Sequence, residues 1–189
     1  MTSACETWRP LLLILLLAIF QTSSQAPTPQ PPSPAPNPVP SIQKPLSAQA
    51  REYLDAHNQA RSAVGVPPLN WSDSLAGATS RQARRQRDQM GCQFADLSSS
   101  KYGANQLWAG GALYIAPRMV VDHWVQEKNF YDHANNSCAA NHKCGVYTQV
   151  VWRKTAELGC AQVACAREGA SLTICFYDPP GNVVGESPY

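Results

Sequence analysis

Residues 147–178, YTQVVWRKTAELGCAQVACAREGASLTICFYD, hold the pattern that decides the fold class. Three short runs rich in β-branched and aromatic residues, 147–152, 158–166 and 171–178, are separated by charged residues or glycine. Runs of this kind, bounded by turn formers, are typical of β-strands. We therefore predict a small, antiparallel sheet in the C-terminal part of the chain.

The residues before this sheet have helical periodicity. Residues 46–65 predict a helix that begins after a capping Ser47 and stops at Gly65. Further helices are predicted over 72–91 and over 116–132, the last with a buried stripe of valine and tryptophan. Helices followed by strands predict an α+β domain in which the helices pack on the sheet.

Composition limits the classes of function. The chain has 189 residues, of which 44% are apolar and 15% charged, so one domain with a packed core is expected. The formal net charge of +2 is too small to predict nucleic acid as a partner. Four arginines, Arg81, Arg84, Arg85 and Arg87, gather on the second predicted helix, where we interpret them as a solvated face.

The N-terminal residues predict export from the cell. The ten-residue apolar run Leu11–Phe20 is long enough for a signal peptide and about half the length of a membrane span, so we assign residues 1–26 to a signal peptide. No later stretch is long and apolar enough to predict a stable membrane span. We predict a secreted, extracellular protein.

Residues 27–46 form a proline-rich linker, because nine of the sixteen prolines lie between Pro27 and Pro45. Such a segment is expected to be an extended, solvated spacer. It is either a plain tether or, in a plant, a site of hydroxylation and glycosylation that associates with the cell wall. The folded domain is expected over residues 47–189.

Cysteine and asparagine patterns agree with a secreted domain. Cys5 leaves with the signal peptide, and an even number of cysteines in the remaining secreted chain predicts three disulfides, for which fifteen pairings are open. Two N-x-S sequons begin at Asn135 and Asn70, and Asn135 is the preferred glycosylation site because it lies in a polar loop. The six remaining cysteines are Cys92, Cys138, Cys144, Cys160, Cys165 and Cys175.

Five ordered motifs carry a resemblance to a known family. They are AHNQAR with VGVPPLNW (56–71), WVQEKNFYD (124–132), the Cys138–Cys144 loop with YTQVVWR (147–153), LGCAQVAC (158–165) and CFYDPPGNVVGESPY (175–189). The chain from Ser47 to Tyr189 resembles the superfamily of cysteine-rich secretory proteins, antigen 5 and pathogenesis-related class 1 proteins, and most of all its plant pathogenesis-related class 1 branch.

The resemblance implies a three-layer α-β-α sandwich, which agrees with the α+β class predicted above. It also implies the disulfide pairs Cys92–Cys165, Cys138–Cys144 and Cys160–Cys175. The first of these closes a loop of more than seventy residues. Such a loop constrains the unfolded chain strongly.

Members of this family typically carry two histidines and two glutamates around a central cleft that is able to bind a divalent metal such as zinc. The resemblance places Asp96 and Val146 at the two histidine positions and Ala104 at one glutamate, so that only Glu127 matches. Zinc takes three or four protein ligands. We therefore predict a degenerate cleft with no metal, no cofactor and no catalytic residue.

A rebuilt metal site is the competing interpretation of the same residues. His123 precedes Glu127 by four residues and therefore shares its helix face, so His123, Glu127 and Asp96 are its candidate ligands. The preferred interpretation is that His123 lies at the edge of the buried stripe. His57 belongs to a motif that the resemblance marks as structural, and His133 and His142 are expected in exposed loops.

Three hypotheses of function follow. The first is a secreted, non-enzymatic and monomeric defence-type protein that binds sterol or other lipid and acts against fungi or oomycetes. Its groove is expected to contain Tyr102, Leu107, Trp108, Leu113 and Tyr114.

The second hypothesis is a precursor whose residues 179–189, PPGNVVGESPY, are released as a signalling peptide. The resemblance implies Cys-Asn-Tyr before the cut, whereas this chain has Cys175-Phe176-Tyr177. The third and least favoured hypothesis is a metal-dependent hydrolase.

Overall fold

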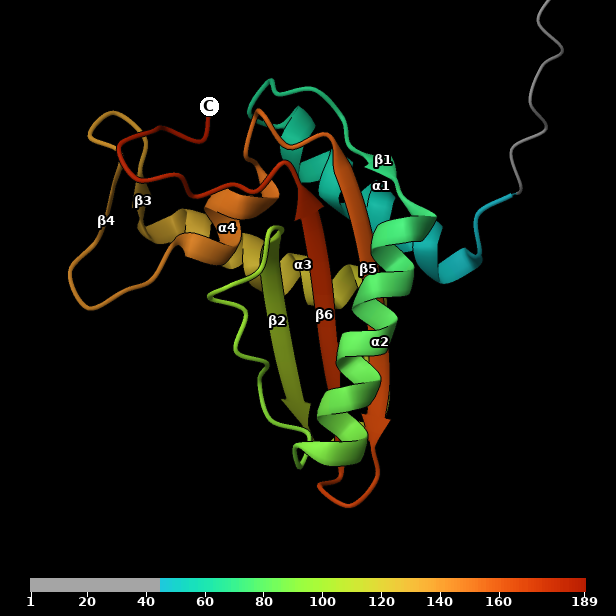
Figure 1. The fold of residues 1–189 in the computed structure, drawn as a ribbon. Coiled ribbons are helices and arrows are strands. Elements are labelled where there is room, and N and C mark those ends of the chain that lie inside the picture. The colour runs from blue at the N-terminus through green and yellow to red at the C-terminus, as the bar shows by residue number, and fades with distance from the viewer. Residues whose placement is uncertain (1–44) are drawn as a thin grey trace, which may run out of the picture. The chain divides into compact units, whose positions relative to one another are not determined.

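A central sheet lies between two layers of helices (Figure 1). The computed structural model describes residues 45–189, so the predicted signal peptide and residues 27–44 of the predicted linker lie outside the described residues. The elements in chain order are α1 (Ala48–Ser62), β1 (Asn70–Trp71), α2 (Asp73–Gln89), β2 (Gly103–Gly110), α3 (Pro117–Val125), the 3-10 helix η1 (Gln126–Phe130), β3 (Tyr131–Asp132), β4 (Ser137–Cys138), α4 (Gly145–Val150), β5 (Glu157–Cys165) and β6 (Ala170–Asp178).

The main sheet has the strand order β1-β5-β6-β2. The long strands β5 and β6 form an antiparallel hairpin, and β2 pairs with β6 antiparallel along its whole length. The short strand β1 pairs with β5 in parallel, so the sheet is mixed and the prediction of a purely antiparallel sheet is corrected at this edge. β3 and β4 form a separate two-stranded sheet. The α+β class and the three-layer sandwich are confirmed.

Two apolar clusters fill the spaces on either side of the sheet. Helix α2 covers one face, and α1 and α3 cover the other, with α4 at the end of that layer (Figure 1). On the α2 side the fit is close at Gly159, where an added Cβ would lie 2.2 Å from the backbone nitrogen of Ala76. The Thr79 hydroxyl also donates to the Gly159 carbonyl, at 3.0 Å. Glycine is therefore needed at position 159 for α2 to approach the strand.

Side-chain caps set the starts of the first two helices. The Ser47 hydroxyl accepts a hydrogen bond from the Ala50 nitrogen at 3.2 Å, which confirms the cap predicted for the first helix. Ser72 caps α2 through the Leu75 nitrogen. Gly65 adopts φ +69°, a left-handed conformation that glycine allows without steric cost, and it turns the chain away after α1.

Two predicted elements differ from the structure. Residues 147–152, predicted as a strand, belong mostly to the short helix α4 and the turn that follows it. The third helix ends at Val125 rather than at residue 132, and a 3-10 turn and the short strand β3 complete that stretch. In both places contacts from distant parts of the chain outweigh the local propensity of the residues.

Three disulfides close the domain, and their pairs are Cys92–Cys165, Cys138–Cys144 and Cys160–Cys175, as the resemblance implies. The first pair, 73 residues apart, joins the turn after α2 to the end of β5. In the chain-entropy model a closed loop of this length stabilises the fold by ~4 kcal/mol.

Candidate functional site

A cleft of about 330 Å³ lies where β2, α3, η1 and the start of α4 meet. Of the residues predicted to form the family cleft, Glu127 and Val146 line it, together with His123. Asp96 and Ala104 are not among its lining residues. The full lining is Phe94, Gln106, Leu107, His123, Trp124, Gln126, Glu127, Phe130 and Val146.

Glu127 is used as a helix cap. Its Oε2 accepts hydrogen bonds from the backbone nitrogens of Val146, at 3.1 Å, and Tyr147, at 3.3 Å. These nitrogens lie in the first turn of α4, where backbone N–H groups have no partner inside the helix and where the helix dipole favours a negative charge. The side chain of Cys144, the N-cap residue of α4, makes no capping hydrogen bond. The carboxylate therefore stabilises the start of α4.

Arg61 holds the other end of the same helix. This fully buried side chain donates from Nη1 to the carbonyl oxygens of Val150, at 3.1 Å, and Trp152, at 2.8 Å. Its remaining nitrogens donate to the carbonyls of Pro67 and Thr155. Burial lowers the pKa of Arg61 to about 10, so the guanidinium stays charged near neutral pH. A negative group at the start of α4 and a positive group at its end both complement the helix dipole.

A buried polar chain lies behind the cleft. His57 donates from Nδ1 to the Tyr53 carbonyl, at 2.7 Å, and its Nε2 accepts from the Tyr177 hydroxyl, at 2.8 Å. Asn105 donates to the Tyr177 oxygen, at 3.1 Å, and to the Val146 carbonyl, at 2.9 Å. Burial lowers the pKa of His57 to about 4, so its imidazole is neutral at pH 7. His57 is thus a structural residue that ties α1 to the sheet and, through Asn105, to α4.

The residues that the resemblance places at the metal positions are not brought together as a zinc site. Asp96 is exposed and its Oδ1 accepts from the Ser98 nitrogen at 3.0 Å, and hydrogen bonds from Ser98 lower the pKa of this carboxyl. Ala104 offers no ligand atom and packs on the α2 side of the sheet. Among residues 45–189, Asp96, His123 and Glu127 do not form a group close enough to share an ion. The structure does not assemble the rebuilt metal site proposed above.

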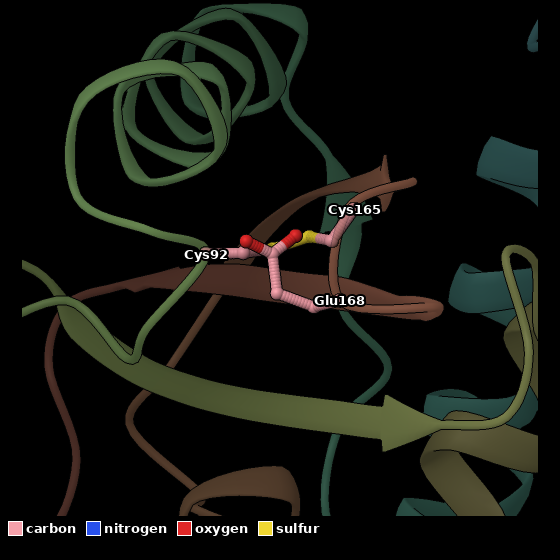
Figure 2. A group of neighbouring side chains, drawn as sticks. All are labelled: Cys92, Cys165 and Glu168. Atoms are coloured by element: carbon pink, nitrogen blue, oxygen red, sulfur yellow. A yellow bond between two sulfur atoms is a disulfide. The ribbon is translucent and has the colours of Figure 1, made fainter.

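The one close group of potential ligands in the described part of the chain is Cys92, Cys165 and Glu168 (Figure 2). Both sulfurs in this group belong to the same disulfide, so neither is a thiolate able to bind a metal ion. Glu168 is exposed beside them. We interpret this group as a surface carboxylate next to a structural disulfide.

An apolar groove of about 460 Å³ continues from the cleft along the outer edge of β2. It shares Leu107, His123 and Gln126 with the cleft. Trp108 and Met119, exposed by 42% and 60%, line its outer part. Edge strand β2 and helix α3 thus leave two large apolar side chains, Trp108 and Met119, in contact with solvent at the groove.

The residues predicted to form this groove are only partly brought together. Leu107 and Trp108 line it, whereas Leu113 and Tyr114 are exposed in the loop before α3. Tyr102 is partly buried and packs against the core residue Phe176 on the α2 side, with ring centroids 5.5 Å apart. Met119 and Ile115 line the groove and were not identified from the sequence.

Residues 179–189 pack against α4 and the β3–β4 loop. The Tyr189 hydroxyl bonds to that of Tyr147 at 3.0 Å, and its ring stacks on His133 with centroids 4.2 Å apart. The Arg153 nitrogen donates to the Pro188 carbonyl, and Lys154 forms an ion pair with Glu186. These contacts attach the segment to the rest of the domain in the intact chain, and its release as a peptide stays a prediction.

The two sequons differ in their surroundings. Asn70 lies in β1, where its backbone nitrogen bonds to the Ala156 carbonyl. Asn135 is exposed in the loop between β3 and β4, and its Nδ2 donates to Asp132 at 2.6 Å. Both asparagines are exposed, and glycosylation of either stays a prediction.

Replacing Glu127 with alanine is expected to destabilise the domain by about 1–2 kcal/mol, because two N–H groups of α4 lose their acceptor. Glu127→Gln keeps an acceptor oxygen and is expected to lose less than about 1 kcal/mol. Urea unfolding of the two variants measures the difference. A glutamine variant as unstable as the alanine variant would contradict the capping role.

Known proteins resemble this chain in sequence. Residues 54–177 match the model of the cysteine-rich secretory protein family. The chain is 61% identical over 143 residues to the STS14 protein of Solanum tuberosum. This alignment covers 76% of this chain and 66% of that protein. It is 45% identical to pathogenesis-related protein 1C of Nicotiana tabacum, over 74% of this chain and 80% of the relative.

A solved structure has the same fold. Venom allergen-like protein 4 of Schistosoma mansoni superposes with a TM-score of 0.60 at 26% identity, covering 76% of this chain and 95% of that protein.

Proposed function

Since this chain belongs to the cysteine-rich secretory protein family and is similar to plant pathogenesis-related class 1 proteins, we propose that it is a secreted defence-type protein that binds sterol or another lipid. Its proposed targets are fungi or oomycetes, whose membranes would lose the bound lipid. The predicted signal peptide at residues 1–26 and linker at 27–46 support export to the apoplast or cell wall.

The observation that carries the proposal is the apolar groove between β2 and α3. Its volume of about 460 Å³ lies within the roughly 300–1,000 Å³ of typical small-ligand sites. Leu107, Ile115 and Met119 give it an apolar wall, and His123 and Asp122 lie at its polar side. A flat apolar ligand with one hydroxyl, such as a sterol, matches this combination.

We propose that the cleft does no chemistry. General acid–base catalysis needs a positioned pair of groups free to exchange protons. Glu127, the one family carboxylate that remains, is engaged with two backbone nitrogens of α4, and Val146 offers no titratable group. The domain is proposed to act as a monomeric binder.

A sterol-binding measurement on the secreted protein tests the proposal. Met119→Asp places a charge in the groove from an exposed position, so we expect it to weaken the binding of a soluble, labelled sterol about tenfold or more. Val184→Asp is the matched control, since Val184 is 99% exposed on the C-terminal segment, and its affinity should equal that of the wild type. Lack of sterol binding by the wild-type protein would refute the proposal.

A further inference from the structure

A second group of exposed apolar side chains lies at the end of the sandwich opposite the C-terminal segment. Helix α2 ends there, strand β2 ends there, and the hairpin between β5 and β6 turns there, at the lower end of Figure 1. Met90, Phe94 and Trp108 are exposed by 49%, 58% and 42%. Phe94 and Trp108 line one shallow hollow of about 390 Å³ with Glu168. We call Met90, Phe94 and Trp108 the tip.

The backbone under the tip is fixed, so these side chains are held out in solvent. The disulfide Cys92–Cys165 joins the turn after α2 to β5, and the Cys92 nitrogen donates to the Gln86 carbonyl at 2.8 Å. Gly111 bonds to the Gly169 carbonyl and closes the other side of this end. The Trp108 ring lies over Gly110, where an added Cβ would come within 2.9 Å of it. The disulfide and these hydrogen bonds therefore fix the backbone that carries the exposed side chains of the tip.

Positively charged residues lie in the second half of α2, the helix that ends at the tip. Residues 80–94 contain four arginines and one aspartate, Asp88, which pairs with Arg87 at 2.7 Å. The spacing of Arg81, Arg84 and Arg85 places them on the face of α2 opposite its buried residues, and within residues 45–189 none of the three forms a salt bridge. At the hairpin the positive Arg167 is next to Glu168 in sequence.

Apolar and aromatic side chains beside unpaired arginines are the composition of surfaces that bind the interface of a bilayer. Arg84 precedes Met90 by six residues, a rise of about 9 Å along a helix, which is comparable to the Debye length at physiological salt. The long arginine side chains are able to reach headgroups while the apolar tip enters the acyl boundary.

We propose that the tip and the second half of α2 dock the protein on a lipid bilayer that carries anionic headgroups. The inference deepens the proposed lipid-binding function, because it supplies the surface from which the ligand of the β2–α3 groove is taken. The groove opens beside Trp108, so a protein docked through the tip holds the groove close to the bilayer.

Vesicle co-sedimentation of the secreted protein tests the docking surface. The vesicles contain phosphatidylcholine alone or phosphatidylcholine mixed with phosphatidylglycerol. Wild-type protein is expected to bind the mixed vesicles more tightly, and to bind them less as salt is added. Met90→Ser should weaken binding about tenfold. Arg84→Gln combined with Arg85→Gln should weaken binding to the mixed vesicles about twenty-five-fold, since each arginine near an anionic surface contributes about fivefold.

Controls and a spectroscopic readout complete the test. Val184→Ser removes an exposed apolar side chain far from the tip, and Arg51→Gln removes an exposed arginine of α1, so both should bind vesicles as the wild type does. Trp108 is the most exposed tryptophan of residues 45–189, and its emission should shift to shorter wavelength on the vesicles.

Three results would overturn the proposal: equal binding by the tip variants and the controls, no preference for anionic vesicles, or concentration-dependent self-association through the tip. Met90, Arg84 and Arg85 do not line the groove, so their variants should keep the affinity of the wild type for a soluble sterol. Normal sterol affinity with unchanged vesicle binding would refute the docking surface alone. Absent sterol binding with tip-dependent vesicle binding would refute the groove alone.

Discussion

Replacing Arg61 with methionine is expected to destabilise the domain by about 3–5 kcal/mol, because several buried carbonyls would each lose a donor at about 1–3 kcal/mol, and this is a large part of the roughly 5–15 kcal/mol that stabilises a typical domain. The reason is the set of four backbone carbonyls that this one buried guanidinium satisfies, of Pro67, Val150, Trp152 and Thr155. Methionine has a similar length and no donor, so the carbonyls of Pro67, Val150 and Thr155 would lose this donor, while the Trp152 carbonyl would keep only the Thr155 nitrogen. Chemical unfolding of the purified variant measures the loss.

Arg51→Met is the matched control for this prediction. Arg51 lies on the exposed face of the same helix, so its replacement should change the free energy of unfolding by less than about 0.5 kcal/mol. Arg61→Lys is expected to fall between the two, because an ammonium is unable to reach all four oxygens in the fixed geometry of a guanidinium. A loss below about 1 kcal/mol in Arg61→Met would refute the role given to Arg61.

Acid is expected to destabilise the domain through His57. Burial lowers the pKa of His57 from 6.5 to about 4, so between these pH values the unfolded chain binds a proton that the folded chain does not. The contribution of neutral His57 to the free energy of unfolding is therefore complete above pH 6.5, and it is lost as the pH falls from 6.5 to about 4. The loss is about 2 kcal/mol at pH 5 and about 3 kcal/mol at pH 4.

Unfolding free energies of the wild type and of His57→Gln, measured from pH 7 to pH 4, isolate this contribution from that of the carboxylates. The glutamine variant does not titrate here, so its stability should fall less steeply with acid even though it starts lower. His142→Gln removes an exposed histidine and should keep the steep wild-type dependence. Parallel curves for the wild type and His57→Gln would contradict the assignment.

Sequence patterns within a few residues correctly predicted those helices and strands whose ends are set by nearby residues. Ser47 and Gly65 mark the first helix because a hydroxyl cap and a left-handed glycine act within a few residues of themselves. The β5–β6 hairpin follows from β-branched runs with a turn between them. The strand β2, GANQLWAG, was missed because glycine and alanine weaken its pattern, and its pairing with β6 is a long-range contact.

Helix α4 shows why other parts of the fold could not be predicted from the sequence. Its sequence, GVYTQV, contains β-formers and predicted a strand. The groups that make it a helix, Glu127 and Arg61, are 19 and 89 residues from the atoms they bond. The resemblance placed Glu127 among the family's possible metal ligands. Its two hydrogen bonds to α4 show a capping role, which the sequence could not reveal because the bonded atoms are 19 and 20 residues away.

The dependence of α4 on two distant charged groups has a consequence for the order of folding. A helix of six residues is too short to persist in water on its own. Its amides therefore gain lasting protection from hydrogen exchange only after α1 and η1 have docked and brought Arg61 and Glu127 to its ends. We therefore expect Val146, the one residue of α4 that lines the cleft, to become ordered only after α1 and η1 are in place.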